Sequence, residues 1–226
     1  MRKTCGAIIV AAGSAQRMQG IDKMLTPLLG VPVLLRTVRA LSESERIDKI
    51  YIVTRKDLLG QVRALCEKEP KLAAVVAGGD SRAQSVLRGL ETAEEELAAI
   101  HDGARPLAPS NVINEAILTA EEMGAAAPAT PVHDTIKVAH GGTVTRTPDR
   151  SSLFAVQTPQ VFQRKEIIRV LKEALEKDLP LTDDCSAAEA AGLTVRLTKG
   201  SEENLKITVP TDLILAEAIL KRRESL

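Results

Sequence analysis

The chain is poor in aromatic side chains, with one tyrosine, two phenylalanines and no tryptophan among 226 residues. Its core must therefore be built from Val, Ile, Leu and Ala, and the aromatic stacking platforms typical of single-strand nucleic-acid binders are missing. Charge of one sign is not in excess either, because 30 Lys and Arg balance 30 Asp and Glu, so no overall basic field draws a nucleic acid. No run approaches 18 consecutive apolar residues, so no membrane span is indicated.

Cysteine is scarce as well. Cys5, Cys66 and Cys185 lie far apart and show neither a CxxC pair nor the Cys/His spacing of a zinc site. We therefore expect no disulfide framework and a reducing, cytoplasmic location. The N-terminal stretch MRKTCGAIIVAAGSA has the basic start and apolar middle of a signal peptide, but cleavage would remove an informative turn, so we expect it to be retained.

Short apolar runs alternate with amphipathic stretches along the chain. The runs lie at 7–12, 49–54, 72–78, 97–102, 124–130 and 193–198. Spacing predicts helices near 32–44, 56–69, 82–95, 110–122, 164–177, 184–191 and 211–223. This alternation predicts a single α/β domain over residues 1–226, with a mostly parallel sheet covered by helices on both faces. Ligands bind such sheets at the carboxyl ends of the strands.

One segment breaks the alternation. Residues 133–154 carry Gly141–Gly142 between two polar, β-branched runs, which predicts a hairpin. The segment has too little apolar content to pack a core, and an isolated hairpin is marginal in water. We expect it to lie against its own domain or against another subunit.

The first predicted strand runs into small residues and then cations. In AAGSAQRM the small residues allow a ligand to approach the backbone and turn amides to face phosphate oxygens, while Arg17 and Lys23 add positive charge. The spacing matches neither GxxxxGK[ST] nor GxGxxG. A tight strand–helix connection with surface cations explains this stretch equally well.

Two further strand ends carry charge at the same edge of the predicted sheet. AGGDSRAQS gathers Asp80, Arg82 and Ser85 at a helix start, which suits a base edge plus an anion, with a simple capped helix as the alternative. IHDGARP places Asp102 and Arg105 where they could hold Mg²⁺ beside phosphates, with a solvated turn as the alternative.

These turns and several later motifs resemble one family over nearly the whole chain. The motifs are AAGxxxRM…K, GGxxRxxSVxxGL, HDxARP, DTxK, DR…QTPQxF, TDDxSAxExxG and NxKIT. The chain is similar to the cytidylyltransferases that make 4-diphosphocytidyl-2-C-methyl-D-erythritol from CTP and 2-C-methyl-D-erythritol 4-phosphate, in the non-mevalonate route to isoprenoids. Each motif is weak alone, and the combination is highly specific. The resemblance implies a Rossmann-like nucleotidyltransferase sheet with a protruding β-arm that interlocks two subunits, and residues 133–154 fall where the arm belongs.

The resemblance also implies residue roles. Arg17 and Lys23 would be catalytic, neutralising charge on the α-phosphate and the leaving pyrophosphate, and Asp102 would position Mg²⁺ held on the triphosphate. Nucleotide binding would fall to Ala11, Ala12, Gly13, Ser14, Gly79, Asp80, Arg82, Ser85 and Asp102, of which Gly79, Asp80 and Ser85 would select cytosine. Arg105, Thr135, Arg150, Thr182 and Lys206 would bind methylerythritol phosphate or the reacting phosphates.

The implied reaction needs no general base. The acceptor's phosphate oxygen is already anionic, and it would attack the α-phosphorus of CTP and displace pyrophosphate, so that positioning and fixed positive charge suffice. No Ser/His/Asp or Cys/His constellation is expected, and His101, His133 and His140 are interpreted as structural or solvated. LTDDCS is also explained as a helix N-cap with an acidic first turn, and Lys206 as an ordinary strand lysine.

Two positions depart from the family pattern: Ala15 replaces a usual glycine and Gly103 a usual alanine, and neither change removes a charge. Three alternatives remain, namely a cytidylyltransferase for another polyol phosphate such as ribitol 5-phosphate, a sugar-1-phosphate nucleotidyltransferase with another base, and a non-catalytic nucleotide-binding protein. RAQSV and TDDCSAAEAAG favour the methylerythritol enzyme, and Arg17, Lys23 and Asp102 together argue against a non-catalytic protein.

Overall fold

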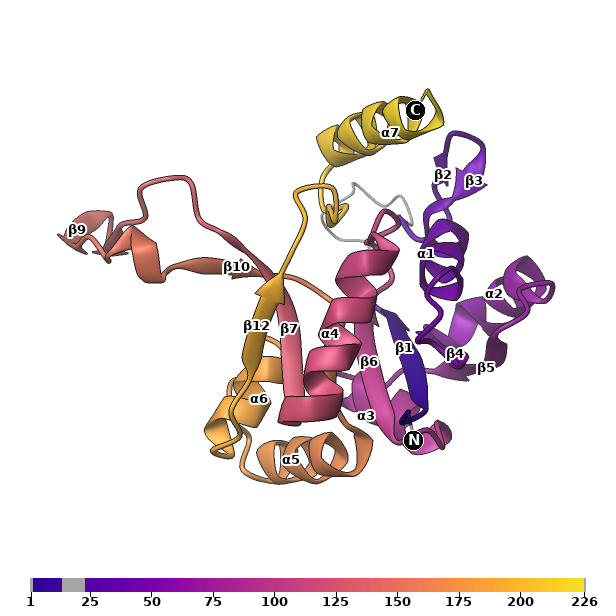
Figure 1. Ribbon diagram of the computed structural model, residues 1–226, viewed down its shortest axis with the longest axis horizontal. Coiled ribbons are helices and arrows are strands. Elements are labelled where there is room, and N and C mark those ends of the chain that lie inside the picture. Colours follow the sequence, from indigo (N-terminus) through magenta and orange to yellow (C-terminus); the bar gives the residue numbers. More distant parts are fainter. Residues whose placement is uncertain (1, 14–22, 226) are drawn as a thin grey trace.

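A computed structural model describes residues 2–13 and 23–225, and within them one large sheet of eight strands (Figure 1). The strand order is β10-β7-β11-β6-β1-β4-β5, with β12 also paired to β7. The strands are β1 (Cys5–Ala11), β4 (Lys49–Thr54), β5 (Leu72–Ala77), β6 (Leu97–Asp102), β7 (Ala125–Pro131), β10 (Phe154–Val156), β11 (Gln160–Gln163) and β12 (Arg196–Lys199). β2 (Pro27–Leu28) and β3 (Val31–Pro32) form a separate short hairpin.

The sheet is parallel where the sequence predicts it and antiparallel near one side. β5, β4, β1 and β6 run parallel, as do β7 and β12, whereas β10 and β11 are antiparallel to their neighbours. The chain passes from β1 to β4 and β5 on one side and then to β6 on the other. The carboxyl ends of β1 and β6 therefore meet where the strand order reverses, which is the usual ligand-binding point of an open α/β sheet.

Helices cover both faces of the sheet, which confirms the predicted fold class. The helices are α1 (Val33–Ser42), α2 (Leu59–Cys66, after a 3-10 turn at Lys56–Leu58), α3 (Arg82–Thr92), α4 (Ser110–Met123), α5 (Arg164–Glu176), α6 (Asp184–Ala190) and α7 (Pro210–Glu224). Residues of α1, α2 and α4 pack in one buried apolar cluster, and residues of α3, α5 and α6 pack in another. Alternate residues of β1 supply the two faces: Ala7 and Ile9 belong to the first cluster and Ile8 to the second.

The predicted hairpin is confirmed over a shorter paired range. β8 (Val138–His140) pairs antiparallel with β9 (Thr143–Arg146). The turn glycines Gly141 and Gly142 have φ of 54° and 81°, which a two-residue hairpin turn of this kind requires. The hairpin extends away from the sheet at the left of Figure 1 and returns to β10 through a 3-10 turn at Arg150–Ser152.

The hairpin segment exposes apolar side chains, including Ile136 and Val144, which are 41% and 54% exposed. Among the described residues, no helix combines the length and the apolar character needed to cross a bilayer.

Candidate functional site

The turns after β1, β5 and β6 surround one cavity of about 350 Å³, a volume in the range of small-molecule sites. Its lining comes from the turn after β1, the start of α3, the end of β6 and the segment before α7. The lining residues are Val10, Ala12, Gly13, Lys23, Met24, Gly79, Asp80, Ser81, Arg82, Ser85, Asp102, Gly103, Ala104 and Lys206. The prediction that three strand ends meet at one edge is confirmed.

Most residues predicted to bind nucleotide lie in this lining. Ala11 is buried at the end of β1, between the lining residues Val10 and Ala12, and is not itself in the lining. Ser14 and Arg17, together with the departure at Ala15, lie outside the described residues. Lys23 lines the cavity, and its Nζ lies 3.5 Å from the carbonyl oxygen of Ile207.

The residues predicted to bind the acceptor are spread more widely. Lys206 lines the cavity, whereas Arg105 is not in its lining and lies beside the lining residue Asp102. Thr182 lines a neighbouring cavity of about 400 Å³, which shares Arg82 with the first. Thr135 and Arg150 lie on the exposed hairpin segment, where Arg150 donates to the carbonyl of His133 at 2.9 Å. Within the described part of one chain, these two residues are not brought to the cavity, and their roles stay predictions.

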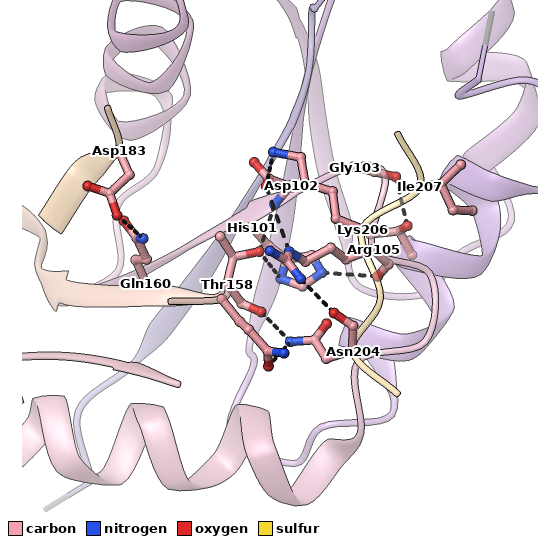
Figure 2. A network of polar contacts seen from close by, with 12 residues as sticks. His101, Asp102, Gly103, Arg105, Thr158, Gln160, Asp183, Asn204, Lys206 and Ile207 are labelled. Atoms are coloured by element: carbon pink, nitrogen blue, oxygen red, sulfur yellow. Dashed lines mark hydrogen bonds and ion pairs between the residues drawn. The ribbon is translucent and has the colours of Figure 1, made fainter. Parts of the chain in front are cut away.

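The Asp102 carboxylate has three cations close to it, of which Figure 2 shows Lys206 and Arg105. Lys206 Nζ lies 2.8 Å from its Oδ2, Arg82 Nη2 lies 3.6 Å from its Oδ1, and Arg105 Nε lies 3.8 Å from Oδ2. Burial alone would raise its pKa, but Lys206, followed by Arg82 and Arg105, outweighs burial and lowers the pKa to about 2. Asp102 is therefore ionised at neutral pH.

Arg82 has a second, buried partner that sequence reasoning missed. Asp184, at the first turn of α6, is 1% exposed and accepts from both Nη1 and Nη2 of Arg82, at 3.0 and 2.8 Å. This bidentate pair fixes the plane of the guanidinium. The motif TDDxSA contains the residue, but nothing in the spacing indicates a partner 102 positions away.

The start of α6 is itself held in place. Asp183 caps the helix in a capping box with Ser186, which confirms the N-cap interpretation of LTDDCS. Gln160 of β11 joins it to the sheet: its Nε2 donates to Asp183 Oδ2 at 2.7 Å, and its Oε1 accepts from the backbone N–H of Asp184 (Figure 2 shows the first of these).

The loop predicted to select the base is folded around Ser85. Its hydroxyl accepts from the N–H of Gly79 at 3.1 Å and donates to the carbonyl of Ser81 at 2.9 Å, while Ser81 caps α3. A Cβ on Gly78 would lie 2.5 Å from Cβ of Ala12 and 2.8 Å from Ser85 Oγ, so this close approach of two turns requires glycine. Contact of Ser85 with a base would have to share or replace its present bonds.

His101 is fully buried, which agrees with its interpretation as structural, and burial lowers its pKa to about 4. The ring is therefore neutral at physiological pH. His133 and His140 are exposed, also as expected. Thr158 and Asn204 lie beside His101 in a buried polar network; the quoted motifs contain both, but sequence reasoning gave them no role (Figure 2).

The residues present fit a magnesium ion that arrives with the nucleotide. Mg²⁺ prefers oxygen ligands and is commonly bound by one or two carboxylates plus substrate phosphates. Asp102 supplies an ionised carboxylate in the lining of the cavity. No cluster of three or more His, Cys, Asp or Glu side chains suited to a metal occurs in the parts of the chain that the structure describes, so the other ligands would come from phosphates and water.

Comparisons with known proteins agree with this geometry. The family model of 2-C-methyl-D-erythritol 4-phosphate cytidylyltransferase matches residues 5–222. A protein of that name from Desulforamulus reducens is 42% identical over 224 residues, covering 96% of each chain. Another from Symbiobacterium thermophilum is 43% identical over 218 residues, covering 95% of this chain and 92% of the relative.

Solved structures give the same result. The crystal structure of 4-diphosphocytidyl-2C-methyl-D-erythritol synthase from Anaerococcus prevotii superposes with a TM-score of 0.87 at 31% identity, covering 97% of this chain and 96% of that chain. That of 2-C-methyl-D-erythritol 4-phosphate cytidylyltransferase from Thermus thermophilus has a TM-score of 0.79 at 29% identity, covering 98% and 100%. The extent of the family match and the identity to relatives over nearly full length establish that this chain belongs to the 2-C-methyl-D-erythritol 4-phosphate cytidylyltransferase family.

Proposed function

We propose that this chain transfers the cytidylyl group of CTP to 2-C-methyl-D-erythritol 4-phosphate and releases pyrophosphate, as a step in the non-mevalonate formation of isoprenoid precursors. The observation that carries the proposal is the cavity at the switch point of the sheet, in a chain of this family. There the turn after β1 and the loop before α3 share the cavity lining with Lys23, Arg82 and Lys206, which are cations suited to a triphosphate.

The reaction is a direct displacement. A phosphate oxygen of the acceptor forms a bond to the α-phosphorus of CTP while the bond from that phosphorus to the bridging oxygen of the β-phosphate breaks, and pyrophosphate leaves with the electron pair. The attacking oxygen is anionic, so no side chain has to remove a proton. Lys23 and Lys206 then act by offsetting the charge of two polyanions, and the rigid turns act by holding the reacting atoms in line.

We infer a divalent cation of the magnesium type, which prefers oxygen ligands, with Asp102 as the residue that would hold it beside the triphosphate. When bound, the ion supplies positive charge to the phosphate oxygens. A cytoplasmic location is inferred from the cysteines: Cys5, Cys66 and Cys185 are all buried and unbonded.

Substrate choice is tested by pyrophosphate release. CTP, UTP, ATP and GTP are each combined with methylerythritol 4-phosphate or ribitol 5-phosphate and a magnesium salt. The proposal predicts turnover chiefly with CTP and methylerythritol 4-phosphate, because a site built to pair one base edge rejects another strongly. Equal use of CTP and UTP would contradict cytosine selection, and preference for ribitol 5-phosphate would contradict the acceptor.

We also infer a homodimer in which the hairpin segment reaches the partner's cavity. Support comes from its exposed apolar side chains Ile136 and Val144 and from the placement of Arg150 outside its own cavity lining, among described residues. The guanidinium of Arg150 can bind a phosphate through two parallel hydrogen bonds.

Mixing two inactive variants tests this arrangement. Lys23→Ala impairs the cavity and Arg150→Ala impairs the hairpin, so a mixed dimer holds one site with both changes and one with neither if the hairpin reaches the partner, and one change at each site if it does not. If the hairpin serves the partner, mixing and re-equilibration restore about half the wild-type activity per mixed dimer, one site of two. If Arg150 serves its own chain, mixing restores nothing, and a monomer at assay concentration would also contradict the inference.

A further inference from the structure

His101, the residue before Asp102 in β6, uses both ring nitrogens (Figure 2). Nε2 lies 3.2 Å from the carbonyl oxygen of Arg105, and Nδ1 lies 3.1 Å from Thr158 Oγ1. A carbonyl oxygen only accepts, so Nε2 carries the proton and the neutral ring accepts through Nδ1 from the Thr158 hydroxyl. Thr158 Oγ1 in turn accepts the backbone N–H of Asp102 at 3.1 Å.

These bonds belong to a closed cycle of hydrogen bonds among four residues, called the hydrogen-bond ring below to distinguish it from the imidazole. Arg105 Nη1 donates to the carbonyl of Asn204 at 2.6 Å. Asn204 Nδ2 donates to the carbonyl of Thr158 at 2.9 Å. The Thr158 hydroxyl then returns to His101, and His101 to Arg105. The hydrogen-bond ring joins three segments that are far apart in the sequence, and Asp102 lies between two of its members.

The turn that follows Asp102 is fixed at its other backbone groups as well. The N–H of Gly103 donates to the carbonyl of Val10 at 2.9 Å, and the carbonyl of Gly103 accepts from the buried hydroxyl of Thr37 at 2.8 Å. The carbonyl of Ala104 accepts from the N–H of Ile207, also at 2.8 Å. With its backbone held on all sides, the turn has little freedom to adjust if one bond of the hydrogen-bond ring is lost.

Asp102 and Arg105 carry opposite charges and lie close together without a hydrogen bond between their side chains. Arg105 Nε is buried and lies 3.8 Å from Asp102 Oδ2, beyond hydrogen-bond distance, and it makes no hydrogen bond to any described residue. Asp102 Oδ2 is instead in contact with Lys206 Nζ at 2.8 Å, whereas Arg82 and Asp184 form a bidentate pair. The backbone, the hydrogen-bond ring and the contact of Asp102 with Lys206 together set the spacing between Asp102 and Arg105.

We propose that His101 is a positioning residue for the transfer reaction: it closes the hydrogen-bond ring with Thr158, Asn204 and Arg105 and thereby fixes the position of the Asp102 carboxylate in the cavity lining relative to the Arg105 guanidinium. The proposal deepens the proposed function and rests on it. His101 is not among the lining residues that the structure describes, so it acts through its neighbours. Its loss should lower kcat more than it weakens binding of CTP.

The first test needs neither substrate nor variant. Nitrogen-15 NMR of the intact wild-type chain distinguishes a protonated from an unprotonated ring nitrogen. The proposal predicts that the buried histidine is the neutral tautomer with the proton on Nε2. A proton on Nδ1, or a mixture of tautomers, would overturn it. This result does not depend on transferase activity, so it tests the hydrogen-bond ring even if the proposed function is wrong.

The second test reads the hydrogen-bond ring at Asp102 by amide hydrogen exchange. Thr158→Val removes the hydroxyl at nearly constant shape, and Thr158→Ser keeps it. Exchange of the Asp102 N–H should quicken about tenfold in the valine variant and stay near wild type in the serine variant. Thr92→Val is the matched control, because the Thr92 hydroxyl, on exposed helix surface, bonds only the carbonyl of Arg88 among the described residues. Equal exchange in the Thr158 pair would contradict the proposal.

The third test separates positioning from binding by steady-state kinetics. His101→Leu removes both bonds, while His101→Gln can still donate to the Arg105 carbonyl. The leucine variant should lose about tenfold or more in kcat with the KM for CTP within about twofold, and glutamine should recover part of the loss. Unchanged kcat, or equal loss with both, would refute the role. If the leucine variant does not fold, the Thr158 pair gives the same comparison.

Discussion

Replacing Asp102 by asparagine keeps the shape of the side chain and removes a charge that Lys206, Arg82 and Arg105 share. These cations outweigh burial and lower the pKa of Asp102 from 3.8 to about 2. That difference corresponds to roughly 2 kcal/mol of folded-state stability, at about 1.4 kcal/mol per pKa unit. The side chain is 13% exposed, so solvent screening removes little of this amount.

The pH dependence follows from the direction of this pKa change. Because the pKa is lower in the folded chain, the contribution is fully present above about pH 4 and disappears as the pH falls through about 2. Urea unfolding should therefore show Asp102→Asn less stable than wild type by about 2 kcal/mol at pH 7, with the difference shrinking below pH 4. Asp178→Asn, at an exposed turn with positive φ that asparagine also tolerates, is the control and should match wild type. A difference that is absent at pH 7, or that is the same at pH 7 and pH 3, would refute the reasoning.

Two further substitutions separate catalysis from stability. Lys23→Ala should lower kcat about 10²–10³-fold and leave the melting temperature near wild type, because it removes charge that stabilises the transition state and no packing. Lys68→Ala, at an exposed position after α2, is the control and should change neither kcat nor the melting temperature. Near-normal turnover of Lys23→Ala would show that the turn after β1 is only a connection. Asp184→Asn should lower the free energy of unfolding by about 3 kcal/mol, because it removes the buried charge that pairs with Arg82. The melting temperature should fall by about 6–12 °C. A calorimetric shift below about 2 °C would contradict that assignment.

The parallel half of the fold could be predicted from sequence because its strands are continuous apolar runs. The predicted ranges 49–54 and 97–102 coincide with β4 and β6. β11 could not be predicted in this way because Gln160–Gln163 has only two apolar residues and follows a proline. Its strand character comes from pairing with β6 and β7, which is a tertiary effect that no local pattern records.

The site could be predicted as far as topology determines it. Parallel strands end at one edge, so Asp80 and Asp102 were expected at the same edge of the sheet, and both line the cavity there. The partners of each charge could not be predicted in this way, since the Arg82–Asp184 pair depends on where the start of α6 lies relative to Arg82 of α3 and Gln160 of β11. Likewise, burial of His101 followed from its place in an apolar run, whereas its bonds to Thr158 and Arg105 depend on three distant segments meeting.

In the proposed reaction, charge and positioning alone effect the transfer, and the acceptor's own phosphate oxygen is the nucleophile. The most direct test of this mechanism is the stereochemical course at phosphorus, using CTP with sulfur in one defined configuration on the α-phosphate, methylerythritol 4-phosphate as acceptor, and phosphorus NMR of the product. A single in-line displacement predicts a diphosphocytidyl product with inverted configuration at that phosphorus. Retention would require two displacements through a covalent nucleotidyl-enzyme, and it would contradict direct attack by the acceptor.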